Sequence, residues 1–345
     1  MRIRTLLVAG TVLAVTVATA LIASSVGSAS SSKTNASNFS MAIVTDIGSL
    51  QDRSFNQLAN EGRIAIGKKL KIKTRAIETH SAAERIPNAL TACRQGYKMI
   101  FEVGFLNYTA LNAVAPRCPQ AQFAGIDQPY VLFSKKPKNA AGVVFAEQEA
   151  GYLVGYLGAL ELKSQGGKQI MSAVGANNVP AIVHYISGYI QGAKKANPRV
   201  KVLANYANDP TFNDQAKCHE TALNQIQQGS RVVFQVAGGC GLGALKAAKE
   251  NKIWGIGVDA DQRYLGPFML TSALKRVDTS VEDLTQLAIK GQLKTQKDYV
   301  FSLKNDGVGL GSVSPKVPKS FIAKTNAIAK KIGAGKIKVK AQIKF

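Results

Sequence analysis

The chain has 345 residues, of which 46% are hydrophobic, 19% charged and 7% aromatic. This composition excludes a disordered chain, a collagen-like repeat and a membrane protein with many spans, and the length indicates about two domains. Lys and Arg number 44 against 21 Asp and Glu, and the net charge of +23 favours an anionic neighbour such as nucleic acid, anionic lipid or a wall polymer.

The N-terminal region predicts export from the cytoplasm. Arg2 and Arg4 precede an uncharged apolar stretch, 6–23, and small residues follow it. This pattern is typical of a secretory signal peptide, here residues 1–29. An uncleaved signal anchor is the alternative, because the apolar stretch is close to the length of a membrane span. The region has no Cys, so lipid attachment by the usual bacterial lipoprotein route is not expected.

Export changes how the basic charge is interpreted. After a polar linker at 30–39, cleavage would leave a net charge of about +21, and residues 316–345 hold nine Lys and no acid. An exported protein meets little nucleic acid, so that partner is not expected. Attraction of the basic tail to an anionic envelope and simple solubility are the two remaining explanations. We expect an extracytoplasmic protein at the outer face of the cell membrane or envelope.

Four Cys residues form an even set in this exported chain: Cys93, Cys118, Cys218 and Cys240. Three pairings are possible. The separations of 25 and 22 residues favour two local disulfides, Cys93–Cys118 and Cys218–Cys240. No Cys-x-x-Cys pair is present, so we expect neither a metal site nor thioredoxin-like chemistry at these residues.

From residue 41 onward, predicted strands and helices alternate. The first series has strands at 41–45, 73–77, 98–103, 122–126 and 142–145, and helices at 56–70, 82–95, 109–115 and 147–162. The second has strands at 169–174, 201–206, 231–236 and 253–258, and helices at 180–196, 214–228 and 242–250. Strands separated by helices predict parallel sheets with right-handed crossovers. The fold class is therefore α/β, with two doubly wound Rossmann-like lobes.

The remaining segments define the expected domain boundaries. A strand-like run at 268–271, a helix at 276–290, a strand at 300–303 and a glycine-rich loop at 307–311 are expected to return to the first lobe. Lobe one would then be 40–141 plus about 265–315, lobe two 142–264, and the basic tail 316–345 with a helix at 319–332. Several crossings between lobes make a hinge, and ligands bind where parallel strands end.

Polar residues stand at the ends of several predicted strands. Asp46, Asp127 and Asp259 each end an apolar run, and Asn107 follows another. One such acid alone is usually a loop or cap residue. Three acids in equivalent places predict a shared polar pocket, because the carboxyl ends of parallel strands meet at one edge of a sheet.

Five segments resemble one protein family. They are Ser-Phe-Asn-Gln-x-x-x-Glu-Gly at 54–62 with Asp46 before it, Glu-Ala-Gly-Tyr-Leu-Val-Gly-Tyr at 149–156, Gly-Tyr-Ile-Gln-Gly-Ala-Lys at 188–194, Gly-Val-Asp-Ala-Asp-Gln at 257–262 and Leu-Thr-Ser-Ala-Leu-Lys at 270–275. In this order they are similar to the basic membrane protein family of ABC-transporter substrate-binding proteins, from about residue 40 to 315. The resemblance implies a two-lobed periplasmic-binding-protein fold of the first type. It also implies a monomer that hands purine nucleosides to a membrane permease with an ATPase partner.

The resemblance implies a set of ligand-binding residues. They are Asp46, Phe55, Asn56, Asn107, Asp127, Phe212, Gly238, Asp259 and Lys275. Asp46 and Asn56 would contact the base or order the first loop, and Asp127 would bind a base edge. Phe55 and Phe212 would stack on the two faces of the purine.

The two remaining roles concern the backbone and the sugar. Gly238 would let the backbone approach the ligand, and Asp259 and Lys275 would hold ribose hydroxyls. No catalytic residue, metal or cofactor is expected. The family normally carries a lipidated Cys, which this chain lacks.

Two other functions remain as alternatives. Asp259 and Asp261 could hold a divalent ion, as in a nucleoside hydrolase, if several carboxylates converged on it. A ligand-sensing receptor could use the same two-lobed fold. The glycine-rich run at 237–243 does not fit the Gly-x-Gly-x-x-Gly template of a dinucleotide site.

Overall fold

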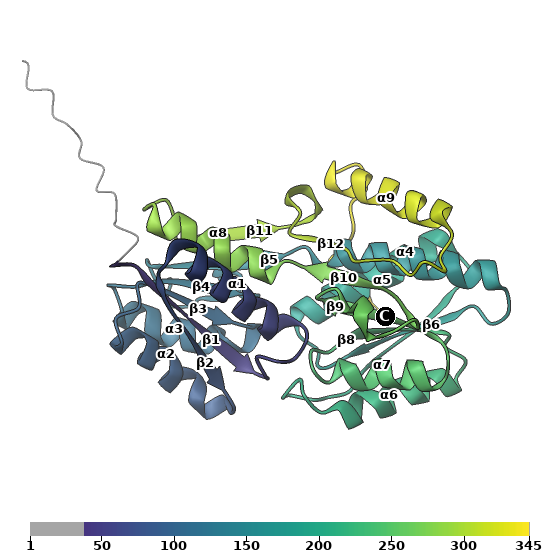
Figure 1. Ribbon diagram of the computed structural model, residues 1–345, viewed down its shortest axis with the longest axis horizontal. Coiled ribbons are helices and arrows are strands. Elements are labelled where there is room, and N and C mark those ends of the chain that lie inside the picture. Colours follow the sequence, from purple (N-terminus) through teal and green to yellow (C-terminus); the bar gives the residue numbers. More distant parts are fainter. Residues whose placement is uncertain (1–37, 345) are drawn as a thin grey trace, which may run out of the picture. The chain divides into compact units, whose positions relative to one another are not determined.

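The computed structural model describes residues 38–344, which form two six-stranded sheets with helices on their faces (Figure 1). Each sheet defines one lobe. The expected α/β fold with two doubly wound lobes is confirmed. The predicted signal peptide and most of the linker lie outside the described residues. Among residues 38–344, no helix is long and apolar enough to cross a membrane.

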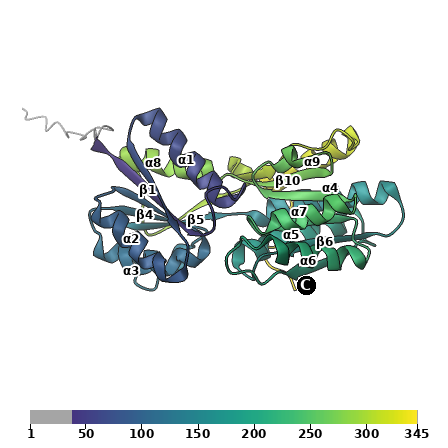
Figure 2. The same cartoon turned by 60° about the horizontal axis from the view of Figure 1, so that its bottom comes forward.

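Lobe one contains a fully parallel sheet in the order β11-β5-β4-β3-β1-β2. Its strands are β1 (Ser40–Ile47), β2 (Lys73–Thr79), β3 (Met99–Val103), β4 (Gln122–Ile126), β5 (Ala140–Phe145) and β11 (Asp298–Phe301). Its helices are α1 (Phe55–Leu70), α2 (Arg85–Arg94), α3 (Tyr108–Val114) and α8 (Val277–Ile289). Helices α1 and α8 cover one face of the sheet and α2 and α3 the other (Figure 2).

Lobe two contains a sheet in the order β12-β10-β9-β8-β6-β7, with only β12 antiparallel. Its strands are β6 (Ile170–Gly175), β7 (Lys201–Tyr206), β8 (Val232–Val236), β9 (Trp254–Asp259), β10 (Met269–Lys275) and β12 (Val308–Leu310). Its helices are α4 (Glu147–Gln165), α5 (Pro180–Ala196), α6 (Gln215–Gln227), α7 (Gly241–Glu250) and α9 (Lys319–Gly333). Helix α4 packs against α5 and α9, and α6 packs against α7.

The chain passes between the lobes three times, between β5 and α4, between β10 and α8, and between β11 and β12. This differs from the expected boundaries. Strand β10 pairs with β9 and stays in lobe two, as do β12 and the C-terminal helix α9, whereas β5 completes lobe one. An apolar run predicts a buried strand but does not say which of two parallel sheets it joins.

Two of the family-like segments are explained by helix packing. Gly151 and Gly155 on α4 face Tyr185 and Tyr189 on α5 so closely that an added Cβ would collide with the facing backbone carbonyls. The glycines of α5 meet α4 in the same way. Small residues four apart allow this close approach of two helix backbones. These glycines allow α4 and α5 to pack closely in lobe two.

The structure contains two disulfides, Cys93–Cys118 in lobe one and Cys218–Cys240 in lobe two. The first joins the end of α2 to the segment before β4 and lies in the core between the sheet and α2 and α3. The second joins the first turn of α6 to the start of α7. Each pair is local in sequence, with partners 25 and 22 positions apart.

Candidate functional site

A cavity between the lobes is lined by residues from the carboxyl ends of strands in both sheets. Its lining includes Asp46, Phe55, Asn56 and Asp127 from lobe one and Phe212, Gly238, Asp259 and Lys275 from lobe two. The parallel strands of each sheet run toward this edge, so residues at their ends come together. The structure thus gathers all but one of the residues singled out from the sequence.

Lys275, the last residue of β10, lies at the centre of the charged groups in this cavity. Its side chain is 1% exposed, and Nζ lies 2.7 Å from the carboxylate of Asp127 and 3.0 Å from Oε1 of Glu147. Burial lowers the pKa of Lys275, but the nearby carboxylates, led by Asp127 and Glu147, outweigh it and hold the pKa above its usual range. Lys275 is therefore charged and compensates the acids around it.

Asp127 and Asp259 both line the cavity but differ in their hydrogen-bond partners. Burial raises the pKa of Asp127 to about 6, although Lys275 opposes this shift. Burial also raises the pKa of Asp259, whose Oδ2 accepts from the Ser54 hydroxyl at 2.6 Å and whose Oδ1 accepts from the Tyr185 hydroxyl at 3.2 Å. Each carboxylate oxygen of Asp127 lies 2.7 Å from Nζ of Lys275. The ammonium group of Lys275 therefore holds Asp127 at the cavity wall.

Aromatic rings form the apolar part of the site. Lys275 Nζ lies 5.0 Å from the ring centroid of Phe55 and 4.7 Å from that of Phe145, within the range of cation–π attraction. Phe55 begins α1 in lobe one, and Phe212 precedes α6 in lobe two. Both rings line the cavity. Aromatic side chains from opposite lobes are suited to a flat ligand that enters between them.

The backbone of the site adopts an uncommon conformation at three non-glycine residues. Asp127, Phe212 and Asp259 have φ values of 64°, 58° and 61°. Such left-handed residues are held in place by their surroundings and cluster at functional sites. Gly238 also has a positive φ of 57°, and an added Cβ would lie 3.4 Å from the carbonyl oxygen of Phe212. The structure therefore holds several cavity residues in fixed positions.

Asp46 is paired inside lobe one. Its Oδ1 accepts from Arg85 at 2.8 Å. Burial raises the pKa of Asp46, while Arg85 opposes the shift. Asp46 therefore lines the cavity while the guanidinium group of Arg85, which does not line it, balances its charge.

The loop before α1 is organised by a second acid, Asp52. Its carboxylate accepts hydrogen bonds from the backbone amides of Ser54, Asn56 and Gln57. Asp52 therefore caps α1, whose first residue is Phe55. Burial raises the pKa of Asp52 to about 6. Asn56 donates to the same carboxylate, and its own Oδ1 has no partner among the described residues. This amide oxygen is itself buried.

Asn107 is the exception among the predicted site residues. Its amide donates to the backbone carbonyls of Val44 and Val103, and its side chain is fully buried behind the cavity wall. The turn after β3 causes this, because Gly104 has a φ of 96° and turns the chain so that Phe105 and Leu106 line the cavity instead. Asn107 shapes the strand end and does not face the ligand space.

Sequence reasoning missed several residues of the site. Glu147 connects Lys275 to His184, which lies 3.1 Å from its other oxygen, and Tyr185 and Ser54 both donate to Asp259. Burial raises the pKa of Glu147, but Lys275 and His184 outweigh it and hold the pKa below its usual range. The signal for Glu147 was its place in the first turn of a helix that follows a buried strand.

The two acids of the proposed metal alternative point to different partners. Asp259 faces Ser54 and Tyr185 in the cavity. Asp261 accepts from the backbone amides of Arg263 and Ser312 outside it. The two carboxylates do not converge on one point, as a shared divalent ion would require.

Known proteins resemble this chain in sequence and fold. An ABC transporter nucleoside-binding protein, BmpA, of Lactococcus lactis is 34% identical over 78% of this chain and 80% of its own length. An uncharacterized lipoprotein of Pyrococcus abyssi is 31% identical over 84% of this chain and 73% of its own length. A crystal structure of an ABC transporter solute-binding protein from Aeropyrum pernix superposes with a TM-score of 0.77 at 26% identity, covering 87% of this chain and 92% of that one.

These relatives are consistent with an extracytoplasmic location, because some of them are named lipoproteins.

The model of one family, described as ABC transporter substrate-binding protein PnrA-like, matches residues 39–343. The match spans both lobes and every residue that lines the cavity. The chain therefore belongs to the PnrA-like family of ABC transporter substrate-binding proteins.

Proposed function

We propose that the protein captures a purine nucleoside between its two lobes and delivers it, unchanged, to a membrane permease that works with an ATPase. The observation that carries the proposal is the composition of one cavity. Aromatic rings from opposite lobes, Phe55 and Phe212, line the same space as a buried cluster of Lys275 with acids. A nucleoside combines a flat aromatic base with a polar sugar, and the cavity offers a partner for each part.

The base would lie between the two rings. Stacking on an aromatic side chain contributes roughly 1–3 kcal/mol per base in single-stranded nucleic-acid binding. Asp127 would accept hydrogen bonds from the base edge at the cavity wall. Asn56 would add its unpartnered amide oxygen at the same wall.

The sugar would lie toward lobe two. Asp259 and Lys275 would hold the ribose hydroxyls, because a carboxylate accepts from a diol and an ammonium group donates to it. Gly238 would let the backbone approach without a side chain in the way. The printed name of the Lactococcus relative, a nucleoside-binding protein, supports this ligand class.

Capture would involve a hinge motion of the two lobes. Ligand would first meet Asp46, Phe55 and Asp127 on lobe one, and lobe two would then close over it with Phe212. The closed form would be the one that docks on the permease. We expect the protein to act as a monomer and to leave the glycosidic bond intact, since Asp259 and Asp261 do not converge.

The test is calorimetric titration of the mature protein with adenosine, guanosine and inosine, with ribose and free bases as controls. Micromolar or tighter binding of a nucleoside, recovered intact by chromatography, supports the proposal. Recovery of free base would instead indicate a hydrolase. Binding of none of these compounds would overturn the nucleoside assignment.

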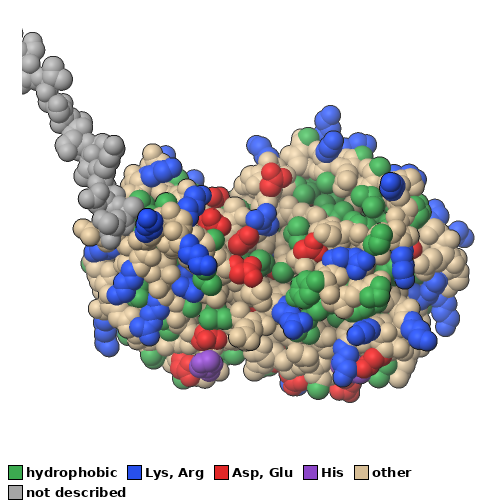
Figure 3. Space-filling view, viewed as in Figure 1, with side chains coloured by type: hydrophobic (Ala, Val, Ile, Leu, Met, Phe, Trp, Pro, Cys, Tyr) green, Lys and Arg blue, Asp and Glu red, His purple; other side chains and the backbone are tan. Residues whose placement is uncertain are grey.

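We also propose that the basic C-terminal tail retains the protein at an anionic cell envelope. Four of its Lys residues are exposed: Lys336, Lys338, Lys340 and Lys344. Gln191 and Ser187 of α5 fix the tail by hydrogen bonds to Lys340 and Ile343, so the alternating Lys residues are held outward. They add to a surface on which Lys and Arg are widespread (Figure 3).

Vesicle co-sedimentation tests this retention. The protein should bind phosphatidylglycerol vesicles at low salt and lose binding when the four Lys are changed to Gln. Vesicles of phosphatidylcholine alone are the control. Equal binding of the wild type and the variant to both kinds of vesicle would contradict a role for the tail.

A further inference from the structure

We propose that the Cys218–Cys240 disulfide positions Phe212 for ligand binding and so sets the affinity of the closed site. This inference rests on the proposed function, because it concerns the ring assigned to one face of the base. It assigns Cys218–Cys240 a role that the other disulfide, Cys93–Cys118, does not share.

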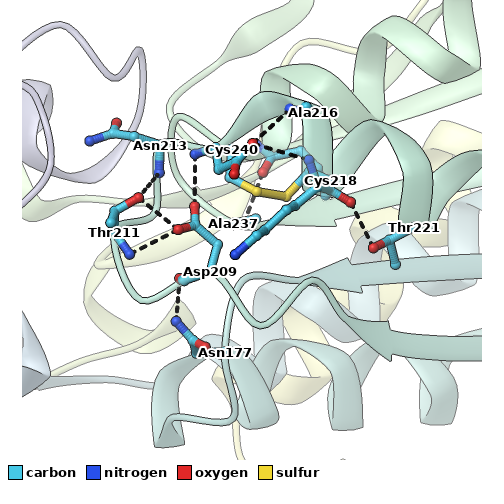
Figure 4. Close-up of a disulfide and its surroundings, with 12 residues drawn as sticks. Asn177, Asp209, Thr211, Asn213, Ala216, Cys218, Thr221, Ala237 and Cys240 are labelled. Carbon is cyan, nitrogen blue, oxygen red and sulfur yellow. Dashed lines mark hydrogen bonds between the residues drawn. A yellow bond between two sulfur atoms is a disulfide. The ribbon is translucent and has the colours of Figure 1, made fainter.

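Phe212 belongs to a loop between β7 and α6 that is fixed mainly by one acid. The carboxylate of Asp209, 1% exposed, accepts from the backbone amide and the hydroxyl of Thr211 and from the backbone amide of Asp214. Asn177 donates to the backbone carbonyl of Asp209 from the neighbouring loop (Figure 4). These bonds hold the two ends of the loop and leave Phe212 between them.

The backbone of Phe212 itself is held by the disulfide partner. The amide of Cys240 donates to the carbonyl oxygen of Phe212 at 2.8 Å. Phe212 has a left-handed φ of 58°, which is uncommon for a bulky residue and persists only where its surroundings enforce it. The position of Cys240 therefore decides whether this conformation of Phe212 is kept.

The disulfide fixes Cys240 relative to the far end of the same loop. Cys218 lies in the first turn of α6, and its amide donates to the carbonyl of Asp214. Phe212, α6, the disulfide and Cys240 thus form a closed ring of covalent and hydrogen bonds. Without the sulfur–sulfur bond, the hydrogen bond from Cys240 to Phe212 and the packing of α6 on α7 would have to hold Cys240 in place without a covalent link.

The other disulfide provides a matched control. Cys93–Cys118 closes a loop of similar length, 25 residues against 22, so the two bonds restrict the unfolded chain to a similar degree. It lies in the core of lobe one, and neither of its residues lines the cavity. A general loss of stability should therefore affect both pairs, whereas loss of positioning should affect only one.

The experiment compares C218A/C240A with C93A/C118A in two ways. Hydrogen exchange of the ligand-free proteins should show faster exchange of amides at 208–214 in C218A/C240A only. Titration with the nucleoside that the wild type binds should show about tenfold weaker binding for C218A/C240A, because a preorganised ring loses less freedom on binding. C93A/C118A should bind within about twofold of the wild type at a temperature where both variants are folded.

A double-mutant cycle separates positioning from general destabilisation. In a Phe212→Ala background, C218A/C240A should cause no further loss of affinity, since the positioned ring is already absent. Equal losses in the two disulfide variants, or the same tenfold loss without Phe212, would overturn the inference. Failure of the wild type to bind any nucleoside would sink the proposed function alone, because the exchange measurement needs no ligand.

Discussion

The hydroxyl of Ser54 donates to Oδ2 of Asp259 at 2.6 Å, and this bond joins the start of α1 in lobe one to the end of β9 in lobe two. Gln262 adds a second link, with its amide 3.0 Å from the backbone carbonyl of Arg53. The loop that presents Phe55 is therefore held directly against the strand end that carries Asp259. In the proposed capture, closure of the lobes would therefore complete the ligand site at this point.

Ser54→Ala should favour the open form and weaken ligand binding. The variant removes a buried hydrogen bond to a charged group, a type of bond that contributes about 1.5–3 kcal/mol. Small-angle scattering of the ligand-free protein should show a larger radius of gyration, and calorimetry a weaker nucleoside affinity. Ser49→Ala, in the same loop but bonded only to the amide of Gln51, should leave both unchanged. An unaltered affinity in Ser54→Ala would show that this bond does not support the closed site.

Phe55→Ala should weaken nucleoside binding by about 1–3 kcal/mol, the contribution of one stacked face. The ring also lies beside Lys275, so the variant removes a cation–π contact that helps to hold the ammonium group. Isothermal titration at pH 7.5 measures the change. Phe321→Ala on α9, outside the cavity, is the control for a general effect of removing a ring. Wild-type affinity in Phe55→Ala would place the ligand away from this wall.

The affinity for nucleoside should fall as the pH decreases through about 6. Asp127 has a pKa of about 6 in the ligand-free protein because it is buried, and a ligand that donates to its carboxylate lowers that pKa in the complex. Binding then requires loss of a proton below pH 6, so the affinity decreases there by up to about tenfold per pH unit. Above about pH 7 the acid is already ionised, and the profile should be flat.

Asp127→Asn separates this effect from other groups that titrate nearby. Burial also raises the pKa of Asp52 to about 6, and Glu147, Asp259, Lys275 and His184 surround the same cluster. The variant should bind more weakly at pH 7.5 and show a much flatter profile between pH 5 and 7. A profile as steep as that of the wild type would assign the titration to Asp52 or another member of the cluster.

Much of this architecture follows from the sequence, for reasons that particular residues make clear. Buried parallel strands are largely apolar runs, such as β5, so their number and order along the chain are visible. Asp46, Asp127 and Asp259 could be grouped before any coordinates, because parallel strands end at a common edge. The assignment of β10 to lobe two could not be predicted, since its pairing with β9 leaves no local mark in the sequence.

The misassigned and missed residues depend on three-dimensional detail of the same kind. Asn107 follows a strand as the site acids do. The turn at Gly104, however, directs the side chain of Asn107 into the core. In the sequence, Glu147 is an acid in the first turn of a predicted helix, where its charge would interact favourably with the helix dipole. Its pairing with Lys275 arises only because β10 ends beside the start of α4.

Glu102 on β3 should make the stability of the protein fall as the pH rises. Its side chain is fully buried, and neither carboxylate oxygen has a hydrogen-bond partner among the described residues. Burial, reinforced by Asp46, raises its pKa well above the usual value. The folded state therefore holds a proton that the unfolded chain releases above about pH 4.5, and this contribution to stability is lost as the pH approaches the folded pKa.

Glu102→Gln carries no titrating proton at this position, so its free energy of unfolding should decline less between pH 5 and 9 than that of the wild type. Urea denaturation at a series of pH values measures the difference, with Glu78→Gln on the exposed side of β2 as the control. Parallel curves for the wild type and Glu102→Gln would mean that the buried acid is ionised and compensated. The most informative point is the alkaline end, where folding of the wild type must either take up a proton or bury a carboxylate without a partner, and folding of the variant requires neither.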